Sequence, residues 1–492
     1  MILVIINTII IMGELRDKMI IGIKWGAIGK FATQGVNFII GLVLARLLTP
    51  QDYGVVGMVA IFFAIAQTFI DGGFGSAIIR KEDCTEGDYS TAFYINVLVA
   101  LLCSFLFVAF SSSIANFFQT PILAKVVKVM SLNMIIGSLI IVPSAILTRD
   151  IDFKTQSKIS LVASIISGAC GIMCAYSGLG VWSLVVQNIM SNLVRAIALL
   201  FVTRWLPKCV IKRESLSYLS QFGSKILVAN LLHSIYCNLT TLIIGKFYTP
   251  KDLGYYSRGE SIAAFPNNSI TNVLQSVSYP VLAKLQRDEL QLVAAYKKLL
   301  SMSSLVIFFG MFLLLAVARP LVVMLLTEKW INSVLYIQVF CIAYMFDHIS
   351  YLNINLLYVK GYSNLVLRLE IIKKTISILL ILSAVPLGIL AICIARTIYS
   401  QIAVIINTYY SGKLFDLGYL NQFKEYAKYI LFSAIASTPA FLLSFTQINS
   451  LIQIIIGGVI ALIIYVILLH NDPNIKELKE LLKNKVTKPG IQ

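Results

Sequence analysis

Four cations stand inside stretches of the sequence that are otherwise apolar enough to cross a bilayer: Lys30, Arg195, Arg258 and Arg396. A Lys or Arg at mid-bilayer costs roughly 2.5–3.5 kcal/mol on insertion scales, so each needs water, a partner or a bound anion. Acids within or beside these stretches are few: Asp71, Glu260, Asp347 and Glu370. This excess of cations over acids favours an anionic ligand.

Polar side chains share helix faces with two of these cations. Gln34 and Asn37 follow Lys30 at one-turn and two-turn spacing, on one side of a helix. A second polar stripe begins at Arg258. Hydrogen bonding between helices is one interpretation, and a wet cavity is the other. We favour the cavity, because hydrogen bonding alone does not require cations, and assign ligand binding to Lys30, Gln34, Asn37, Arg195, Arg258, Asn268, Asn272 and Gln275.

Other chemistry is sparse in the sequence. Asp347 and His348 are candidates for carrying a proton or sodium ion, and a packed, hydrogen-bonded pair is the alternative. The eight cysteines include no C-x-x-C pair, and Cys170 and Cys174 have no His nearby. We therefore expect no metal site, no cofactor and no catalytic residue.

The composition indicates the setting of these residues. Of the 492 residues, 58% are hydrophobic and 13% are charged, and the mean hydropathy is +0.85. Soluble domains average about 45–50% apolar and about 25% charged residues. The composition therefore excludes a soluble enzyme, a disordered chain and a secreted disulfide scaffold. The net charge of +17 is typical of basic loops on the cytoplasmic side of a membrane, so we expect no nucleic-acid partner.

Apolar runs predict an all-α polytopic membrane protein with about 14 spans of about 20 residues. No gap between the runs is large enough for a soluble catalytic domain. The expected limits are 22–45, 53–71, 90–111, 129–147, 157–177, 181–203, 224–245, 255–277, 297–318, 333–358, 364–385, 389–410, 427–446 and 450–469.

Basic residues set the expected orientation. With the N-terminus inside and alternating spans, 29 Lys and Arg fall in inner segments and 7 in outer segments, which predicts both termini in the cytoplasm. Residues 1–18 are expected to be an extension, with translation starting at Met1 or Met12. Residues 471–492 form a basic tail, in which Asp472–Lys488 is either an amphipathic helix on the inner surface or a frayed tail.

A short motif occurs twice in the chain. Thr49-Pro50-x-Asp52-x-Gly54 recurs 200 residues later as Thr249-Pro250-x-Asp252-x-Gly254. We expect Pro to end one helix, Asp to cap the next and Gly to ease the turn. A parallel internal repeat is typical of transporters that rock one half against the other.

Several segments together resemble bacterial polysaccharide transporters: Lys24–Gly26, Ala45–Gly54, Phe69–Gly75, Leu147–Lys154, Gly180–Leu184 and Thr327–Trp330. The chain is most similar to Wzx-type lipid-linked oligosaccharide flippases of the colanic-acid and teichuronic-acid exporter branch. The resemblance implies the multidrug/oligosaccharidyl-lipid/polysaccharide exporter fold, with two six-helix lobes in a V and two further helices. The expected divisions are 19–206, 207–411 and 412–470.

The same resemblance implies a function. The substrate would be undecaprenyl-pyrophosphate carrying a short oligosaccharide, flipped across the bacterial inner membrane by alternating access for lipopolysaccharide or capsule export. Membrane lipids, a polysaccharide polymerase and a chain-length regulator would be partners. The basic cavity of related flippases adds Arg46 to the expected binding residues, whereas Arg396 matches no family position.

Two rival functions remain open. A multidrug and toxin extrusion antiporter would share the fold implied by the resemblance. Such proteins export cations and need acidic cavities, whereas the first span here carries Lys30 and no acid. A membrane glycosyltransferase or polymerase needs catalytic residues in a long external loop, and the external connections here are short.

The charge count predicts the topology of the last hairpin. Reporter domains fused after Lys428 and after Ser450 should report opposite sides of the membrane, because one span separates the two positions. Protease protection or reporter activity measures the side directly. Two fusions on the same side would show that the predicted last hairpin is wrong.

Overall fold

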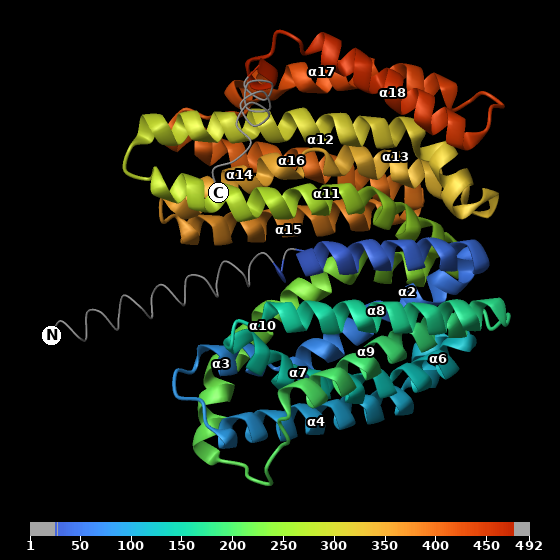
Figure 1. The fold of residues 1–492 in the computed structure, drawn as a ribbon, viewed down its shortest axis with the longest axis vertical. Coiled ribbons are helices and arrows are strands. Elements are labelled where there is room, and N and C mark those ends of the chain that lie inside the picture. Colours follow the sequence, from blue (N-terminus) through green and yellow to red (C-terminus); the bar gives the residue numbers. More distant parts are fainter. Residues whose placement is uncertain (1–24, 27, 477–492) are drawn as a thin grey trace, which may run out of the picture. The chain divides into compact units, whose positions relative to one another are not determined.

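The computed structural model describes residues 25–26 and 28–476, and every regular element in that part of the chain is helical (Figure 1). Two compact units are present, Met1–Gly254 and Tyr255–Gln492. The expected lobe limits at residues 206 and 411 remain predictions. The expected N-terminal extension lies outside the described residues, as does most of the basic tail. The all-helical membrane fold is confirmed.

The first unit is a bundle of apolar helices in which α8 lies along α9, and α7 packs against α4 and α9 (Figure 1). Its helices are Ile28–Leu47, α2 (Pro50–Asp71), α3 (Phe74–Arg80), α4 (Glu86–Ala109), α5 (Ser111–Phe117), α6 (Ile122–Met130), α7 (Leu132–Arg149), α8 (Phe153–Tyr176), α9 (Val181–Thr203) and α10 (Arg213–Phe247). Helix α11 (Pro250–Lys284) begins in this unit.

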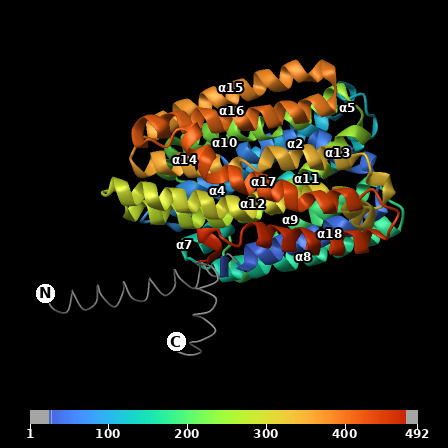
Figure 2. The same cartoon turned by 90° about the horizontal axis from the view of Figure 1, so that it is seen from above.

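In the second unit α12 packs against α17, and α15 lies along α16 (Figure 2). The elements are α12 (Glu289–Leu326), η1 (Glu328–Trp330), α13 (Ser333–Tyr344), α14 (Asp347–Val359), α15 (Ser363–Ala384), η2 (Val385–Leu387), α16 (Ile389–Phe415), α17 (Tyr419–Leu443) and α18 (Ser450–Leu468).

Twelve segments in the described residues are long and apolar enough to cross a membrane. In the part of the chain that the structure describes, each of the 14 expected spans overlaps one helix or two adjoining helices, but α11 and α15 are not among the twelve. Polar residues interrupt the apolar surface of α11, and α15 carries four charged residues close together, among them the Glu370–Lys373 ion pair. The count of 14 is therefore not confirmed.

Both copies of the repeated motif begin a helix. Thr49 is the N-cap of α2, and its side chain accepts a hydrogen bond from the Asp52 amide while the Asp52 carboxylate accepts one from the Thr49 amide at 2.9 Å. Thr249 and Asp252 make the same exchange at the start of α11. This reciprocal capping provides hydrogen-bond acceptors for backbone amides at the start of each helix, which have no partner within the helix itself.

The two copies also pack against each other. A Cβ atom placed on Gly54 would overlap the carbonyl oxygen of Pro250, and one placed on Gly254 would overlap that of Pro50. Gly54 lies within α2 and Gly254 within α11. Their missing side chains permit a backbone contact between the two helices. The expectation that these glycines ease a turn is therefore wrong.

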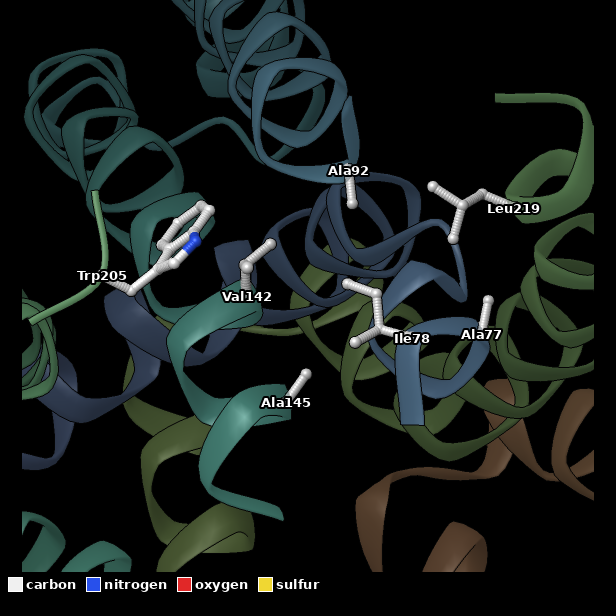
Figure 3. Close-up of a cluster of buried hydrophobic side chains, with 7 residues drawn as sticks. All are labelled: Ala77, Ile78, Ala92, Val142, Ala145, Trp205 and Leu219. Carbon is white, nitrogen blue, oxygen red and sulfur yellow. The ribbon is translucent and has the colours of Figure 1, made fainter. Parts of the chain in front are cut away.

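A second close approach lies at the far end of α2. The helix ends at Asp71, and Gly72 and Gly73 have positive φ angles of 54° and 73° before α3 begins. A Cβ atom on Gly73 would collide with the backbone of Gly223 in α10. Beside this contact lies a buried cluster (Figure 3), composed of Ala77, Ile78, Ala92, Val142, Ala145, Trp205 and Leu219.

The first residues of the basic tail, Asp472 and Asn474, are hydrogen-bonded to helices of the second unit. Asp472 accepts a hydrogen bond from the Lys428 ammonium at 2.6 Å and from the Tyr429 hydroxyl at 3.1 Å. Asn474 donates to Ser301 Oγ at 2.6 Å. Burial favours a higher pKa for Asp472, but the hydrogen bonds that its carboxylate accepts from Lys428, the Asn474 backbone amide and Tyr429 outweigh burial and hold the pKa below its usual value. The expected amphipathic helix continues beyond the described residues and stays a prediction.

The contact between the repeats predicts how the protein responds to an added methyl group. Gly54→Ala should destabilise the protein by about 1–3 kcal/mol, because the new Cβ has no space beside Pro250. Thermal unfolding in detergent measures the change. Gly310→Ala is the matched control, since a Cβ there meets nothing within 4 Å. Equal melting temperatures for the two variants would contradict this account of the contact.

Candidate functional site

A cavity of about 600 Å³ opens in the first unit among the helix Ile28–Leu47, α7, α8 and α9. It brings together four residues that the sequence analysis assigned to binding: Lys30, Gln34, Asn37 and Arg195. The remaining lining residues are Gly26, Gly29, Thr33, Ser144, Phe153, Gln156, Ser157, Ile159, Ser160 and Leu199. We call this space the basic cavity.

A glycine holds the first helix against α8. A Cβ atom at Gly29 would overlap the side chain of Ser157, so only glycine permits this approach. Ser157 Oγ in turn donates a hydrogen bond to the Trp25 carbonyl at 3.2 Å, and the Lys154 ammonium lies 5.2 Å from the Trp25 ring centroid. Lys30 follows Gly29 directly, so this packing fixes the start of the polar stripe at the cavity.

The charge of the cavity is positive. Lys30 is exposed and Arg195 is half-buried, and none of the described lining residues is an acid. Within the described residues, the buried Nε of Arg195 has no hydrogen-bond partner. An arginine with an unsatisfied donor in an apolar helix is costly unless a ligand or water completes its hydrogen bonds.

Neutral polar groups complete the wall. The side-chain Nε2 of Gln156 donates hydrogen bonds to the Ser144 carbonyl and to Thr148 Oγ1, both at 2.9 Å. The side-chain oxygen of Gln156 can therefore accept a hydrogen bond from a ligand. Gln156, Ser157 and Ser160 were not among the residues predicted to bind a ligand. Their spacing along one face of α8 was the available signal.

A second cavity of about 500 Å³ lies between α2, α7 and α10, also in the first unit. Thr68 Oγ1 donates to Ser234 Oγ across it at 3.3 Å. Its lining differs from the basic cavity because it includes an acid and an imidazole. The lining residues are Ala64, Gln67, Thr68, Asp71, Ile141, Asn230, His233 and Ser234.

The structure does not bring all the predicted residues to the basic cavity. Arg46 lies near the other end of the first helix, about 24 Å along the axis from Lys30 at 1.5 Å per residue. Arg258, Asn268 and Gln275 lie on α11 in the second unit, where Arg258 is half-buried and the two amides are exposed. The Asn272 side chain is outside the described part of the chain.

The candidate ion-coupling residues are both hydrogen-bonded. Asp347 Oδ2 accepts a hydrogen bond from Asn267 Nδ2 at 3.1 Å. The buried ring of His348 lies with Nε2 3.0 Å from Ser304 Oγ. This geometry suits a packed pair as well as an ion-carrying one, so ion coupling stays a prediction.

Arg396 has surroundings that the sequence analysis did not foresee. Its guanidinium lies 5.8 Å from the Tyr344 ring centroid, and the Tyr344 hydroxyl donates to Glu260 at 3.1 Å. Glu260 and Asp347 are both close enough to attract Arg396 electrostatically. The charge of Arg396 is thus balanced within its own unit, in contrast to Arg195.

Comparison with known sequences finds three informative similarities. A sequence profile described as "Polysaccharide biosynthesis protein" matches residues 43–335. The succinoglycan biosynthesis transport protein ExoT of Rhizobium meliloti (strain 1021) is 23% identical over 308 residues, which are 63% of this chain and 62% of that protein. The teichuronic acid biosynthesis protein TuaB of Bacillus subtilis (strain 168) is 22% identical over 356 residues, which are 72% of this chain and 74% of that protein.

Solved structures share the fold. The lipid II flippase MurJ, in an inward closed conformation, matches with a TM-score of 0.74 at 16% identity, covering 91% of this chain and 99% of that one. An inward-facing multidrug resistance MATE family transporter matches with a TM-score of 0.57 at 14% identity, covering 78% and 94%. At such low identities the likeness concerns the fold alone.

The unbalanced charge of Arg195 predicts an unusual effect on stability. Arg195→Met should raise the free energy of unfolding by about 1 kcal/mol, because it removes a cation that has no acid partner among the described residues and keeps a flexible, unbranched apolar side chain. Thermal unfolding in detergent measures it.

Lys81→Met is the control for that experiment. Lys81 pairs at 2.6 Å with the buried Asp88, so its loss should lower the stability by about 1–3 kcal/mol. If both variants lower the melting temperature alike, Arg195 has a structural partner and the cavity is not charge-unbalanced.

Proposed function

The chain belongs to the polysaccharide biosynthesis protein family, and we propose that it flips undecaprenyl-pyrophosphate-linked oligosaccharides across the bacterial inner membrane. The named relatives act in the biosynthesis of succinoglycan and teichuronic acid. Since ExoT is covered over 62% of its length, the substrate of this chain rests on its own residues as well as on these relatives.

One observation carries the proposal. Lys30 and Arg195 line one cavity in a membrane helix bundle, and no described lining residue is an acid. A pyrophosphate cannot enter hydrocarbon unless fixed charges and hydrogen bonds replace its water. Arg195 is suited to bidentate contact with phosphate oxygens, and Lys30 acts as a point charge. The two cations would therefore bind the pyrophosphate.

The uncharged groups suit the remainder of the head group. Gln34, Asn37 and Gln156 offer amides beside the cations. The second cavity offers a carboxylate, amides, hydroxyls and an imidazole, which together can donate to and accept from sugar hydroxyls. The glycan would occupy that space, and the apolar prenyl tail would stay in the lipid.

Movement would follow the alternating access of repeat-built transporters. In that scheme the contact between Gly54 and Pro250, with its mirror between Gly254 and Pro50, has to open at one stage of the cycle. Arg46, Arg258, Asn268, Asn272 and Gln275 would line the pathway at other stages. Asp347 and His348 would couple an ion gradient to the movement, and both termini would stay in the cytoplasm.

The rival functions fit the site less well. An exporter of organic cations needs acids in its cavity, and the basic cavity has the opposite charge. A glycosyltransferase or polymerase needs catalytic groups outside the spans, so we propose that the chain is not an enzyme. A polysaccharide polymerase and a chain-length regulator would act on the exported units.

Charge-removing variants test the proposal. Lys30→Gln and Arg195→Gln should each reduce export of the polysaccharide at least about tenfold, because each removes a charge that meets the pyrophosphate, while protein abundance stays near normal. Lys30→Arg should restore part of the activity. The measurement is the accumulation of lipid-linked repeat units in the inner leaflet, together with surface polysaccharide.

Lys158→Gln is the matched control, because Lys158 is exposed on α8 next to the cavity but does not line it. This control should export normally. Normal export by both Lys30→Gln and Arg195→Gln at normal abundance would overturn the proposal.

A further inference from the structure

The connection between α9 and α10 has the composition of a membrane-surface segment. Residues 204–213, here called the basic strap, contain four cations and no acid. Apolar side chains alternate with the cations, and three of them are exposed: Leu206, Val210 and Ile211. Interleaved cations and exposed apolar groups are typical of segments that lie against anionic lipid.

The strap has one defined conformation because it is bonded to α4. The Lys208 amide donates to Ser90 Oγ and the Lys212 amide to Thr91 Oγ1, both at 3.0 Å. The indole of Trp205 donates to Glu86 at 3.2 Å and fills the buried cluster of Figure 3. These contacts use backbone atoms and the Trp205 ring, so the basic side chains stay available.

Arg204 occupies an unfavourable backbone position. Its φ angle is 50°, in the left-handed region that favours glycine. The buried Trp205 on one side and the end of α9 on the other hold it there. Glycine would fit this turn with less strain, so a glycine at this position removes the guanidinium without disturbing the backbone.

That side chain borders an apolar groove. Arg204 lines a cavity of about 500 Å³ together with Ile197, Leu200, Phe201 and Leu206. Phe201 is 76% exposed and Leu206 is 74% exposed. Because α9, one of the helices apolar enough to cross a membrane, ends at Thr203, we expect the cation at the level of the lipid head groups and the apolar part of the groove along the last turns of the span. A charged head above an apolar slot matches the shape of one lipid molecule.

We propose that this groove binds an anionic phospholipid, with the phosphate at Arg204 and an acyl chain along Leu200 and Phe201. The strap lies on the side that the charge count places in the cytoplasm, where anionic lipid attracts basic segments. A free phosphate would leave the apolar groove empty. The site is separate from the basic cavity and does not depend on the proposed transport function.

Native mass spectrometry of the full chain in detergent tests the site. Phosphatidylglycerol and phosphatidylcholine with the same acyl chains are added separately, and one retained lipid is counted. The protein should retain phosphatidylglycerol about fivefold better, as one basic contact at a membrane surface provides. Arg204→Gln should abolish this preference, Arg204→Lys should keep most of it, and Leu200→Trp should reduce retention of both lipids by filling the groove.

Two variants separate the lipid site from general effects. Arg204→Gly should lose the preference but keep the melting temperature of the parent protein, since glycine accepts the positive φ angle. Arg213→Gln removes an exposed strap cation that does not line the groove and should leave the preference unchanged.

Three results would overturn the proposal. The first is equal retention of the two lipids by the unaltered protein, and the second is an equal loss in Arg204→Gln and Arg213→Gln, which would indicate diffuse attraction. The third is full displacement of phosphatidylglycerol by equimolar polyprenyl phosphate, which would assign the groove to the transported lipid.

Discussion

Charge inside hydrocarbon is the constraint on which this structure depends. The protein meets it in two ways. Arg396 lies among Tyr344, Glu260 and Asp347, so its charge is balanced by the fold itself. Lys30 and Arg195 instead face a cavity whose described lining has no acid. The charge of Arg396 is thus compensated within the protein, whereas Arg195 needs water or an anion to complete its hydrogen bonds. This difference is the reason for proposing that Lys30 and Arg195, and not Arg396, bind the substrate.

Close helix packing is what makes the cavity possible, and single glycines provide it. Gly29 brings the first helix onto α8 and so sets the position of Lys30. Gly73 and Gly223 bring α3 and α10 together at one end of α2, and Gly54 and Gly254 act at the other. In lipid, where burial of apolar surface gives little drive for helices to associate, such small-residue contacts supply much of the association. The apolar helices need these contacts to leave a polar space of fixed shape.

The sequence predicted the fold class, the family resemblance and the face that carries Lys30, Gln34 and Asn37, because helical periodicity and hydropathy are local properties. The fold and the resemblance are confirmed, and binding at that face stays a prediction. Tertiary features were not predictable in the same way. Gln156 and Ser157 were not singled out, because their sequence positions at the start of an expected span do not show that helix packing brings them to the cavity. Gly54 was predicted to be a turn residue, because its contact with Pro250, which is distant in the sequence, cannot be recognised before the chain is folded. Arg396 was left out of the predicted binding residues because it matches no family position, but the groups on other helices that balance its charge could not be predicted from the sequence.

The reciprocal contact between the repeated motifs has a consequence for how such a chain evolves. Each copy supplies a glycine that accommodates the proline of the other, so neither copy can acquire a side chain at that position alone. Duplicated segments ordinarily diverge independently once each has its own surroundings. Here the surroundings of each copy are the other copy. Because the opposing atoms belong to the backbone of Pro50 and Pro250, no substitution in one copy can make room for a side chain in the other, and both glycines have to be retained for as long as the contact exists.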